Sequence, residues 1–274
     1  MGYDFFTCKE SDSIEASFGK SVGARPINKR DFLKNTEKYI GSKVIARGLR
    51  HNKIIRAAAK YGIDYFYIDT GYFGNIGKKK YWHRVIKNSF HMNKVNKSFS
   101  DKRYKSVQKY FDRGCKDMGI SRDLMTEWRG SGSNILLCPP TLKSLNVTGI
   151  KYDDWMRETI NRLGLVTDRK IIIREKPRSR TIRVRFNTIW QAMDNDIWAV
   201  VTYNSIVGVE SVLYGIPAFC LGPNAADPVA NKTLINMESP KRPPRQDWAN
   251  NLAYNQFTVE EMISGKAWSI LREI

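Results

Sequence analysis

Apolar and polar residues alternate along two parts of the chain in the rhythm of an α/β protein. Short runs of β-branched and aromatic residues, which favour strands, are separated by segments whose apolar residues recur at helical spacing. The first series predicts a strand at 42–48, a helix at 52–62 and a strand at 63–71. A strand, a helix and a second strand in this order predict a parallel pair, because parallel neighbours need a long crossover connection.

A second series of the same kind follows the glycine- and serine-rich segment 130–134, which we interpret as a hinge. Its strand and helix patterns alternate in the order expected for half of a Rossmann-like fold. The stretches 101–118 and 257–273, on either side of this series, are predicted to be helical. The strands of the series are predicted at 134–140, 169–177, 197–203 and 216–222, and its helices at 153–164, 188–194 and 205–215.

The composition excludes some classes of protein. Hydrophobic residues make up 42% of the 274 residues, which is enough for a folded core. No apolar run approaches the roughly 18–20 residues of a membrane-spanning helix. The first ten residues lack the basic and apolar regions of a signal peptide, so we expect a cytoplasmic protein. The four cysteines form no CxxC pair and there are only three histidines, so we expect reduced thiols and no structural metal site.

Positive charge is concentrated in the first half of the chain. The formal charge is +19; residues 1–130 hold 28 Lys/Arg against 13 Asp/Glu, and residues 131–274 hold 18 against 14. Such a surplus predicts a polyanionic partner, and we expect nucleic acid rather than an anionic membrane surface. A solvated surface without a partner is the alternative interpretation.

Basic and aromatic residues interleave over 78–99, where cations suit phosphates and rings suit stacking on an exposed base. The alternative is a basic strand whose aromatic residues belong to the core. The alternating segment 178–185 places two further arginines on one strand face, where they would meet DNA, a diphosphate or solvent. The residues that we expect to contact DNA are Lys78, Lys79, Lys80, Arg84, Lys87, Arg183 and Arg185.

The most informative segment is TYNSIVGVESVLYGIP, residues 202–217, which covers a strand end, a turn and the start of a helix. We expect Ser205 to be the N-cap and Gly208 to let the backbone approach a ligand. The free N–H groups of a helix N-terminus suit a phosphate or diphosphate, and Glu210 could accept hydrogen bonds from ribose hydroxyls. An ordinary capped helix is the alternative. No GxGxxG or GxxxxGK[ST] motif is present.

This segment resembles the donor-site helix of GT-B glycosyltransferases, in which a Ser or Gly pair contacts the diphosphate and a Glu binds the ribose. The segment REKP, residues 174–177, resembles the basic strand-end segment that faces the same diphosphate. Residues 248–268 resemble the tail of phage-encoded and capsule-related glycosyltransferases. The resemblance covers 131–274 well and the first half only in outline.

The resemblance implies an α/β, GT-B-like fold of two Rossmann-like parallel-sheet domains that face a central cleft. It implies a basic acceptor domain at 1–130, a donor domain at 131–256 and a C-terminal helix at 257–274 that packs back on the first domain. The donor would be a nucleotide sugar, most simply UDP-glucose, and the protein a monomer. No metal ligands are assigned, since GT-B enzymes commonly work without a bound metal, although a divalent ion is allowed. The donor-binding residues would be Arg174, Lys176, Ser205, Gly208 and Glu210.

The basic acceptor half and the donor segment together resemble phage DNA glucosyltransferases, which shield phage DNA from host nucleases. This implies double-stranded DNA bearing a 5-hydroxymethylpyrimidine as the acceptor, with the base flipped out of the duplex, in the host cytoplasm. Two alternatives remain open: transfer to an anionic polysaccharide such as capsule or lipopolysaccharide, and a non-catalytic DNA-binding protein.

An inverting transfer needs a general base near the acceptor hydroxyl. We expect Asp69 in this role, because it ends the predicted strand 63–71 and can face the site. The alternative for Asp69 is a turn carboxylate that caps its own backbone. His51 is the second candidate, since histidine can act as a base near neutral pH; its alternative is a surface loop residue. The stereochemical course is not fixed by the sequence.

Overall fold

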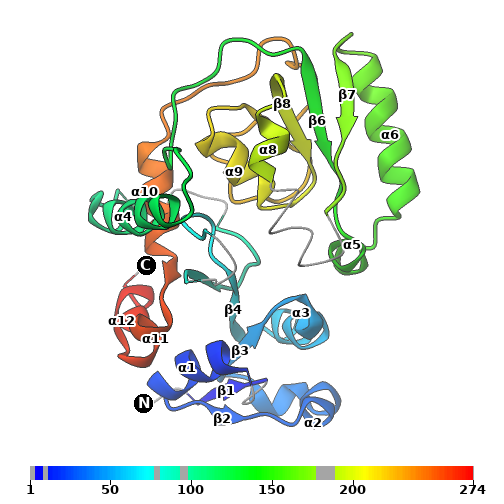
Figure 1. The fold of residues 1–274 in the computed structure, drawn as a ribbon. Coiled ribbons are helices and arrows are strands. Elements are labelled where there is room, and N and C mark those ends of the chain that lie inside the picture. The colour runs from blue at the N-terminus through cyan, green and yellow to red at the C-terminus, as the bar shows by residue number, and fades with distance from the viewer. Residues whose placement is uncertain (1–3, 9–11, 77–80, 93–97, 177–188, 274) are drawn as a thin grey trace. The chain divides into compact units, whose positions relative to one another are not determined.

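The computed structural model describes residues 4–8, 12–76, 81–92, 98–176 and 189–273 (Figure 1). The chain forms two compact units. The first comprises Met1–Asn75, Lys79–Met92 and Asn251–Ile274, and the second Ile76–Lys78 and Asn93–Asn250. The sequence analysis placed its boundaries at residues 130 and 256 instead. The units divide near residues 92 and 250, so the basic residues of 98–130 belong to the second unit.

The first unit is built around a mixed sheet. Its described strands are β1 (Phe5–Thr7), β2 (Arg25–Pro26), β3 (Lys43–Arg47), β4 (Asp64–Thr70), β5 (His83–Lys87) and β10 (Gln256–Phe257). They lie in the order β10-β5-β4-β3-β1-β2. The neighbouring strands β4, β3, β1 and β2 are parallel to one another, whereas β5 is antiparallel to both β4 and β10. The parallel pair predicted from 42–48 and 63–71 is therefore confirmed as β3 and β4.

Helices cover both faces of this sheet. One face packs on α1 (Ser13–Ser21), α11 (Val259–Ile263) and α12 (Lys266–Leu271), and the other on α2 (Lys29–Lys34) and α3 (Asn52–Lys60). The alternation within β3 separates the two cores, because Ile45 faces the α1 side while Val44 and Ala46 face the α3 side. All three side chains have no exposed surface.

The C-terminal segment differs from its prediction. A single helix was expected over 257–273, but β10 is followed by two short helices. Thr258 forms a capping box with Glu261, which fixes where α11 begins. Gly265, with φ +78°, separates α11 from α12. Because α11 packs on α1 and β10 pairs with β5, this segment is part of the first unit.

The second unit contains a parallel sheet in the order β7-β6-β8-β9. Its described strands are β6 (Asn134–Cys138), β7 (Lys170–Ile173), β8 (Ile197–Thr202) and β9 (Ala218–Cys220). Its described helices are α4 (Lys102–Asp117), α5 (Leu142–Thr148), α6 (Tyr152–Gly164), α8 (Ile189–Met193) and α9 (Val207–Leu213), and α10 (Gln246–Tyr254) crosses into the first unit. The predicted alternation of strands and helices is confirmed.

The core of the second unit is also divided by its sheet. Trp155 and Leu163 of α6 pack on one face, and Met193 of α8 and Val207 of α9 on the other. The four cysteines of the chain are free and buried. Among the described helices, none has both the length and the apolar character needed to cross a membrane.

Candidate functional site

The strand order of the second unit defines where a ligand would bind. The connections that leave β6 and β8 run to opposite sides of the sheet, so the carboxyl ends of these neighbouring strands form a topological switch point. Two hydrogen bonds join the end of β8 and the residues after it to the end of β6 and to α5. The hydroxyl of Thr202 donates to the carbonyl of Cys138 at 2.8 Å, and the hydroxyl of Ser144 donates to Asn204 Oδ1 at 2.7 Å. The sequence analysis did not identify Ser144, which lies 60 residues from its partner.

Ser205 is not the N-cap of the following helix. That position belongs to Ile206, whose φ of −58° and ψ of −17° are already helical, and α9 begins at Val207. The predicted cap therefore lies one residue too early in the chain. The carbonyl of Ser205 accepts from the N–H of Gly208 at 3.1 Å and from Asn224 Nδ2 at 2.8 Å. The partly exposed Ser205 hydroxyl accepts only a long bond of 3.4 Å from the N–H of Val207.

Gly208 has a packing role. A Cβ at this position would lie 2.8 Å from Cys220 Sγ and 3.2 Å from Asn224 Oδ1. Real Cβ atoms do not approach other atoms this closely, so only glycine lets α9 pack on β9 here. The close approach that the sequence predicted is therefore made to β9, and the structure does not test an approach to a ligand.

Gly208→Ala is expected to lower the free energy of unfolding by about 1–3 kcal/mol, because the added methyl overpacks the contact with Cys220. Urea unfolding measures this change. Gly164→Ala is the matched control: Gly164 also lies in a helix, but nothing stands within 4 Å of its Cβ position. The control should leave stability unchanged or slightly raised. Equal losses in both variants would contradict the packing argument.

The charges of two donor-site candidates, Arg174 and Glu210, both reach Cys138, the last residue of β6. Burial raises the pKa of the Cys138 thiol to about 12, and the charges of Arg174 and Glu210 act on the same thiol in opposite directions. Arg174 follows β7 directly, and its N–H donates to the carbonyl of Leu137 at 2.9 Å. Arg174 is partly buried and is one of the residues that line a cavity of about 420 Å³. Lys176, two residues on, is exposed.

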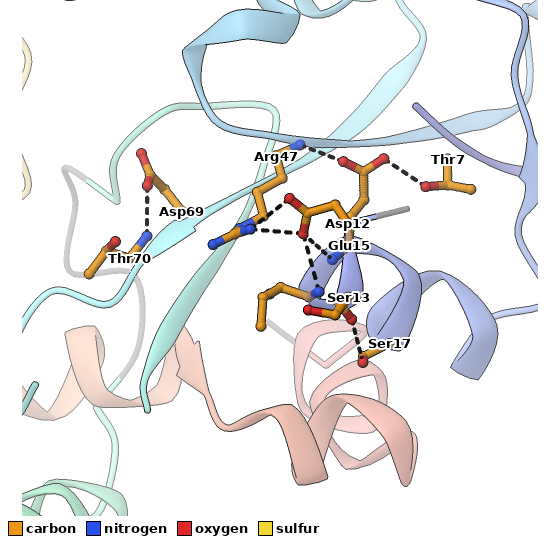
Figure 2. A network of polar contacts seen from close by, with 9 residues as sticks. Thr7, Asp12, Ser13, Glu15, Ser17, Arg47, Asp69 and Thr70 are labelled. Atoms are coloured by element: carbon orange, nitrogen blue, oxygen red, sulfur yellow. Dashed lines mark hydrogen bonds and ion pairs between the residues drawn. The ribbon is translucent and has the colours of Figure 1, made fainter. Parts of the chain in front are cut away.

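The first unit has a switch point of its own, between β1 and β3, and a polar network occupies it (Figure 2). Arg47 Nη1 contacts both carboxylate oxygens of Asp12, at 2.8 and 2.7 Å. Glu15, which has no exposed surface, accepts from the Thr7 hydroxyl at 2.7 Å and from the N–H of Arg47 at 3.1 Å. Burial by itself raises the pKa of Asp12, but hydrogen bonding to Arg47 leaves it below its usual value.

The sequence analysis missed this network. The one available signal was Asp12 followed three residues later by Glu15, a spacing typical of helix starts. Asp12 does cap α1, accepting from the N–H groups of Ile14 and Glu15 at 3.2 Å.

Asp69 lies at the carboxyl end of β4, on the same edge of the sheet as this network (Figure 2). The Tyr67 hydroxyl donates to its Oδ2 at 2.7 Å, and the N–H of Thr70 donates to its Oδ1 at 2.7 Å. Burial and the charge of Asp69 raise the pKa of Tyr67, so this hydroxyl stays protonated and able to donate. The Asp69 side chain remains 37% exposed.

The sequence analysis predicted that Arg84 contacts DNA, but its side chain is buried inside the first unit. It lies directly across from Asp69 in the β4–β5 ladder, and its side chain is only 8% exposed. Its guanidinium reaches Asp69 Oδ2 at 3.3 Å and the carbonyl of Thr70 at 3.0 Å, and it lies near the rings of Tyr67 and Tyr72. The alternative interpretation of the stretch 78–99 therefore holds at His83–Lys87, which forms the strand β5 and follows the buried Trp82.

The remaining predicted residues are dispersed. His51 ends a short 3₁₀ helix after β3 and is buried, so it is not a surface residue. Lys87 is exposed and pairs with Asp64 at 2.9 Å. No three His, Cys, Asp or Glu side chains gather as metal ligands in the part of the chain that the structure describes. Five predicted DNA contacts lie outside the described residues: Lys78, Lys79, Lys80, Arg183 and Arg185.

Comparisons with known proteins identify the fold. No family model matches this sequence, and no curated protein is a significant match. Two solved structures from Thermosulfurimonas dismutans match nearly the whole chain. The KpsC β-Kdo 2,7 transferase has 12% identity and a TM-score of 0.56, and the match covers 97% of this chain and 99% of that one. The KpsC β-Kdo 2,4 transferase has 11% identity and a TM-score of 0.54, with 96% and 98% covered. The chain therefore has the expected α/β, GT-B-type fold.

Proposed function

We propose that the protein is a glycosyltransferase that moves a sugar from a nucleotide-sugar donor to the hydroxymethyl group of a modified pyrimidine in DNA. One observation carries the donor half of this proposal: Arg174 directly follows β7, and Ser205 and Glu210 follow β8, so all three lie beyond strands that adjoin β6 in the parallel sheet. The likeness of nearly the whole chain to two transferase structures supports the same class.

The donor residues have separable roles in this proposal. The guanidinium of Arg174 stabilises the negative charge that develops on the leaving diphosphate. The Ser205 hydroxyl, whose contact with the N–H of Val207 is long, donates to a phosphate oxygen. Glu210 accepts from the ribose hydroxyls, and UDP-glucose is the simplest donor that carries all three groups.

Asp69 is the proposed general base. Asp12, the other aspartate at this sheet edge, has both carboxylate oxygens held by Arg47 and a side chain only 12% exposed. Asp69 is three times more exposed, at 37%. The Tyr67 hydroxyl, the Thr70 N–H and Arg84 orient its carboxylate, and more than a third of the side chain remains exposed, so it fits the role better.

An anionic polysaccharide is the second candidate acceptor. The specific observation in its favour is that both matched structures are titled Kdo transferases. The observation in favour of DNA is the charge of +19, with its surplus of 15 in residues 1–130 (28 basic minus 13 acidic). On the DNA proposal, the target base flips out of the duplex and the added sugar protects phage DNA from host nucleases.

A transfer assay tests the proposed function. The protein is incubated with labelled UDP-glucose or a nucleotide-activated Kdo, and with plain DNA, DNA bearing 5-hydroxymethylcytosine or 5-hydroxymethyluracil, or an acidic polysaccharide. We expect label from UDP-glucose on a hydroxymethylated base and none on plain DNA. Label on the polysaccharide alone would show that the acceptor is a polysaccharide and not DNA. No label on any acceptor, together with no binding of either donor, would contradict the assignment to the glycosyltransferases.

Arg84 is expected to act through Asp69 as a positioning residue. Arg84→Met should lower kcat by about tenfold with KM little changed, because Asp69 loses one of the groups that orient it. Arg84→Lys should recover part of the loss. In an Asp69→Asn background, Arg84→Met should have no further effect on kcat, since the two changes remove one interaction. Additive losses in steady-state kinetics of the four proteins would assign Arg84 a role in folding only.

A further inference from the structure

Helix α4 carries a row of positive charge on one face. Its buried side consists of Tyr104, Val107, Phe111 and Cys115. At about 100° per residue, five exposed cations fall within an arc of about 80° on the opposite side and span about 21 Å. These cations form what we name the α4 basic face: Lys102, Lys105, Lys109, Arg113 and Lys116.

Acidic side chains pair with little of this face: Asp112 and Asp117 lie on the same helix, but neither is within ion-pair distance of its cations. Lys105 pairs with Asp101 at 2.8 Å, in an exposed contact. Among the described residues, the other four cations have no acidic side chain within ion-pair distance. Helix α6 shows the usual alternative, because its exposed Arg157 and Arg162 each pair with an acid one turn earlier.

The row of like charges lowers helix stability, and Asp112, three residues after Lys109 and four before Lys116, offsets only part of that cost. Lys105, Lys109 and Arg113 follow one another at i, i+4 spacing, at which like charges repel and opposite charges attract. Stability alone would favour a glutamate at one of these positions. A negatively charged partner bound to this face would relieve the repulsion between these cations.

We propose that the α4 basic face binds the phosphate backbone of duplex DNA. A rigid row of cations about 21 Å long matches a rigid polyanion that carries one charge per about 1.7 Å of its axis. The proposal deepens the proposed function and rests on it for the identity of the acceptor, since it names the surface that holds the DNA backbone while a base is modified. The contacts it assigns are independent of base sequence.

Two charge reversals test this surface without weakening the helix. Lys102→Glu with Lys109→Glu places new carboxylates beside Lys105 and Arg113 at attractive i, i+3 and i, i+4 spacing, and one near the helix N-terminus. Lys109→Glu also puts a carboxylate three residues before Asp112, which offsets part of the gain, so thermal unfolding should show a Tm close to that of the wild type. The matched control is Lys53→Glu with Lys60→Glu on α3, which changes the same charge on two exposed lysines around Arg56.

Binding is measured as fluorescence anisotropy of an unmodified 20-base-pair duplex over a range of salt, without a sugar donor. The α4 variant should bind at least tenfold more weakly at low salt, and its slope of log K against log salt should fall by about 1.8, for two phosphate contacts. The α3 variant should stay within about threefold of the wild type. Equal losses in both variants, or no loss in the α4 variant, would overturn the proposal.

Two further arms separate this proposal from the proposed function. Transfer to a short hydroxymethylated oligonucleotide at saturating concentration is measured for the same variants. Loss of duplex binding in the α4 variant of a protein that transfers no sugar would support the surface and contradict the enzyme. An acidic polysaccharide that binds this face more tightly than the duplex at equal salt would overturn the assignment to DNA.

Discussion

Asp69→Asn is expected to lower kcat for sugar transfer by about 10²–10⁴-fold, the contribution typical of a general base, with the KM for the donor nearly unchanged. The amide is almost the same size as the carboxylate and keeps an oxygen that can accept from the Tyr67 hydroxyl. It cannot take a proton from the acceptor. The loss should therefore fall on the chemical step, and single-turnover kinetics with saturating donor and acceptor measure it.

Asp64→Asn is the matched control for this prediction. Asp64 begins the same strand that Asp69 nearly ends, and it forms a comparable ion pair with Lys87 at 2.9 Å. The same change of charge on the same strand should leave kcat within about threefold of the wild type, as expected for an exposed surface pair. If Asp69→Asn also retained kcat, the base would have to be sought at Asp12 or His51.

The parts of the fold that the sequence predicted correctly are those whose signal is local. The strands β3, β4, β6 and β8 are runs of apolar residues that are buried, so composition alone marks them. Helices α3 and α6 follow from apolar periodicity and lie within a residue or two of their expected bounds.

The errors come from residues whose environment is set by distant parts of the chain. His83–Lys87 looks like a basic surface segment until β10, which lies about 170 residues later, pairs with it and covers it. That pairing buries Arg84 and turns a predicted DNA contact into the partner of Asp69. The sequence also could not show that the Asn224 side chain would donate a hydrogen bond to the carbonyl of Ser205.

The sequence could predict which strand ends carry the candidate site residues, but not which side chains bond to one another there. Arg174, Glu210 and Asp69 were identified because each lies at or beyond a predicted strand end, where ligands of parallel sheets bind. The Asp12–Arg47 contact joins residues 35 positions apart, and nothing in either local sequence specifies the other. Contacts of this kind follow from the strand order, which single-sequence patterns do not define.

Arg174→Met is expected to lower kcat/KM for the donor by about 10²–10³-fold, because a preorganised cation at the leaving diphosphate is worth that much in comparable sites. The fold should survive the change, since the bond from residue 174 to Leu137 uses the backbone N–H and methionine fills a similar space.

Lys176→Met is the control. This lysine is exposed, so water screens its charge, and its loss should cost less than about fivefold. Initial rates over a range of donor concentration, with isothermal titration of the free nucleotide diphosphate, distinguish the two residues. Equal effects of the two substitutions would mean that general positive charge, and not the placement of the Arg174 guanidinium, acts on the diphosphate.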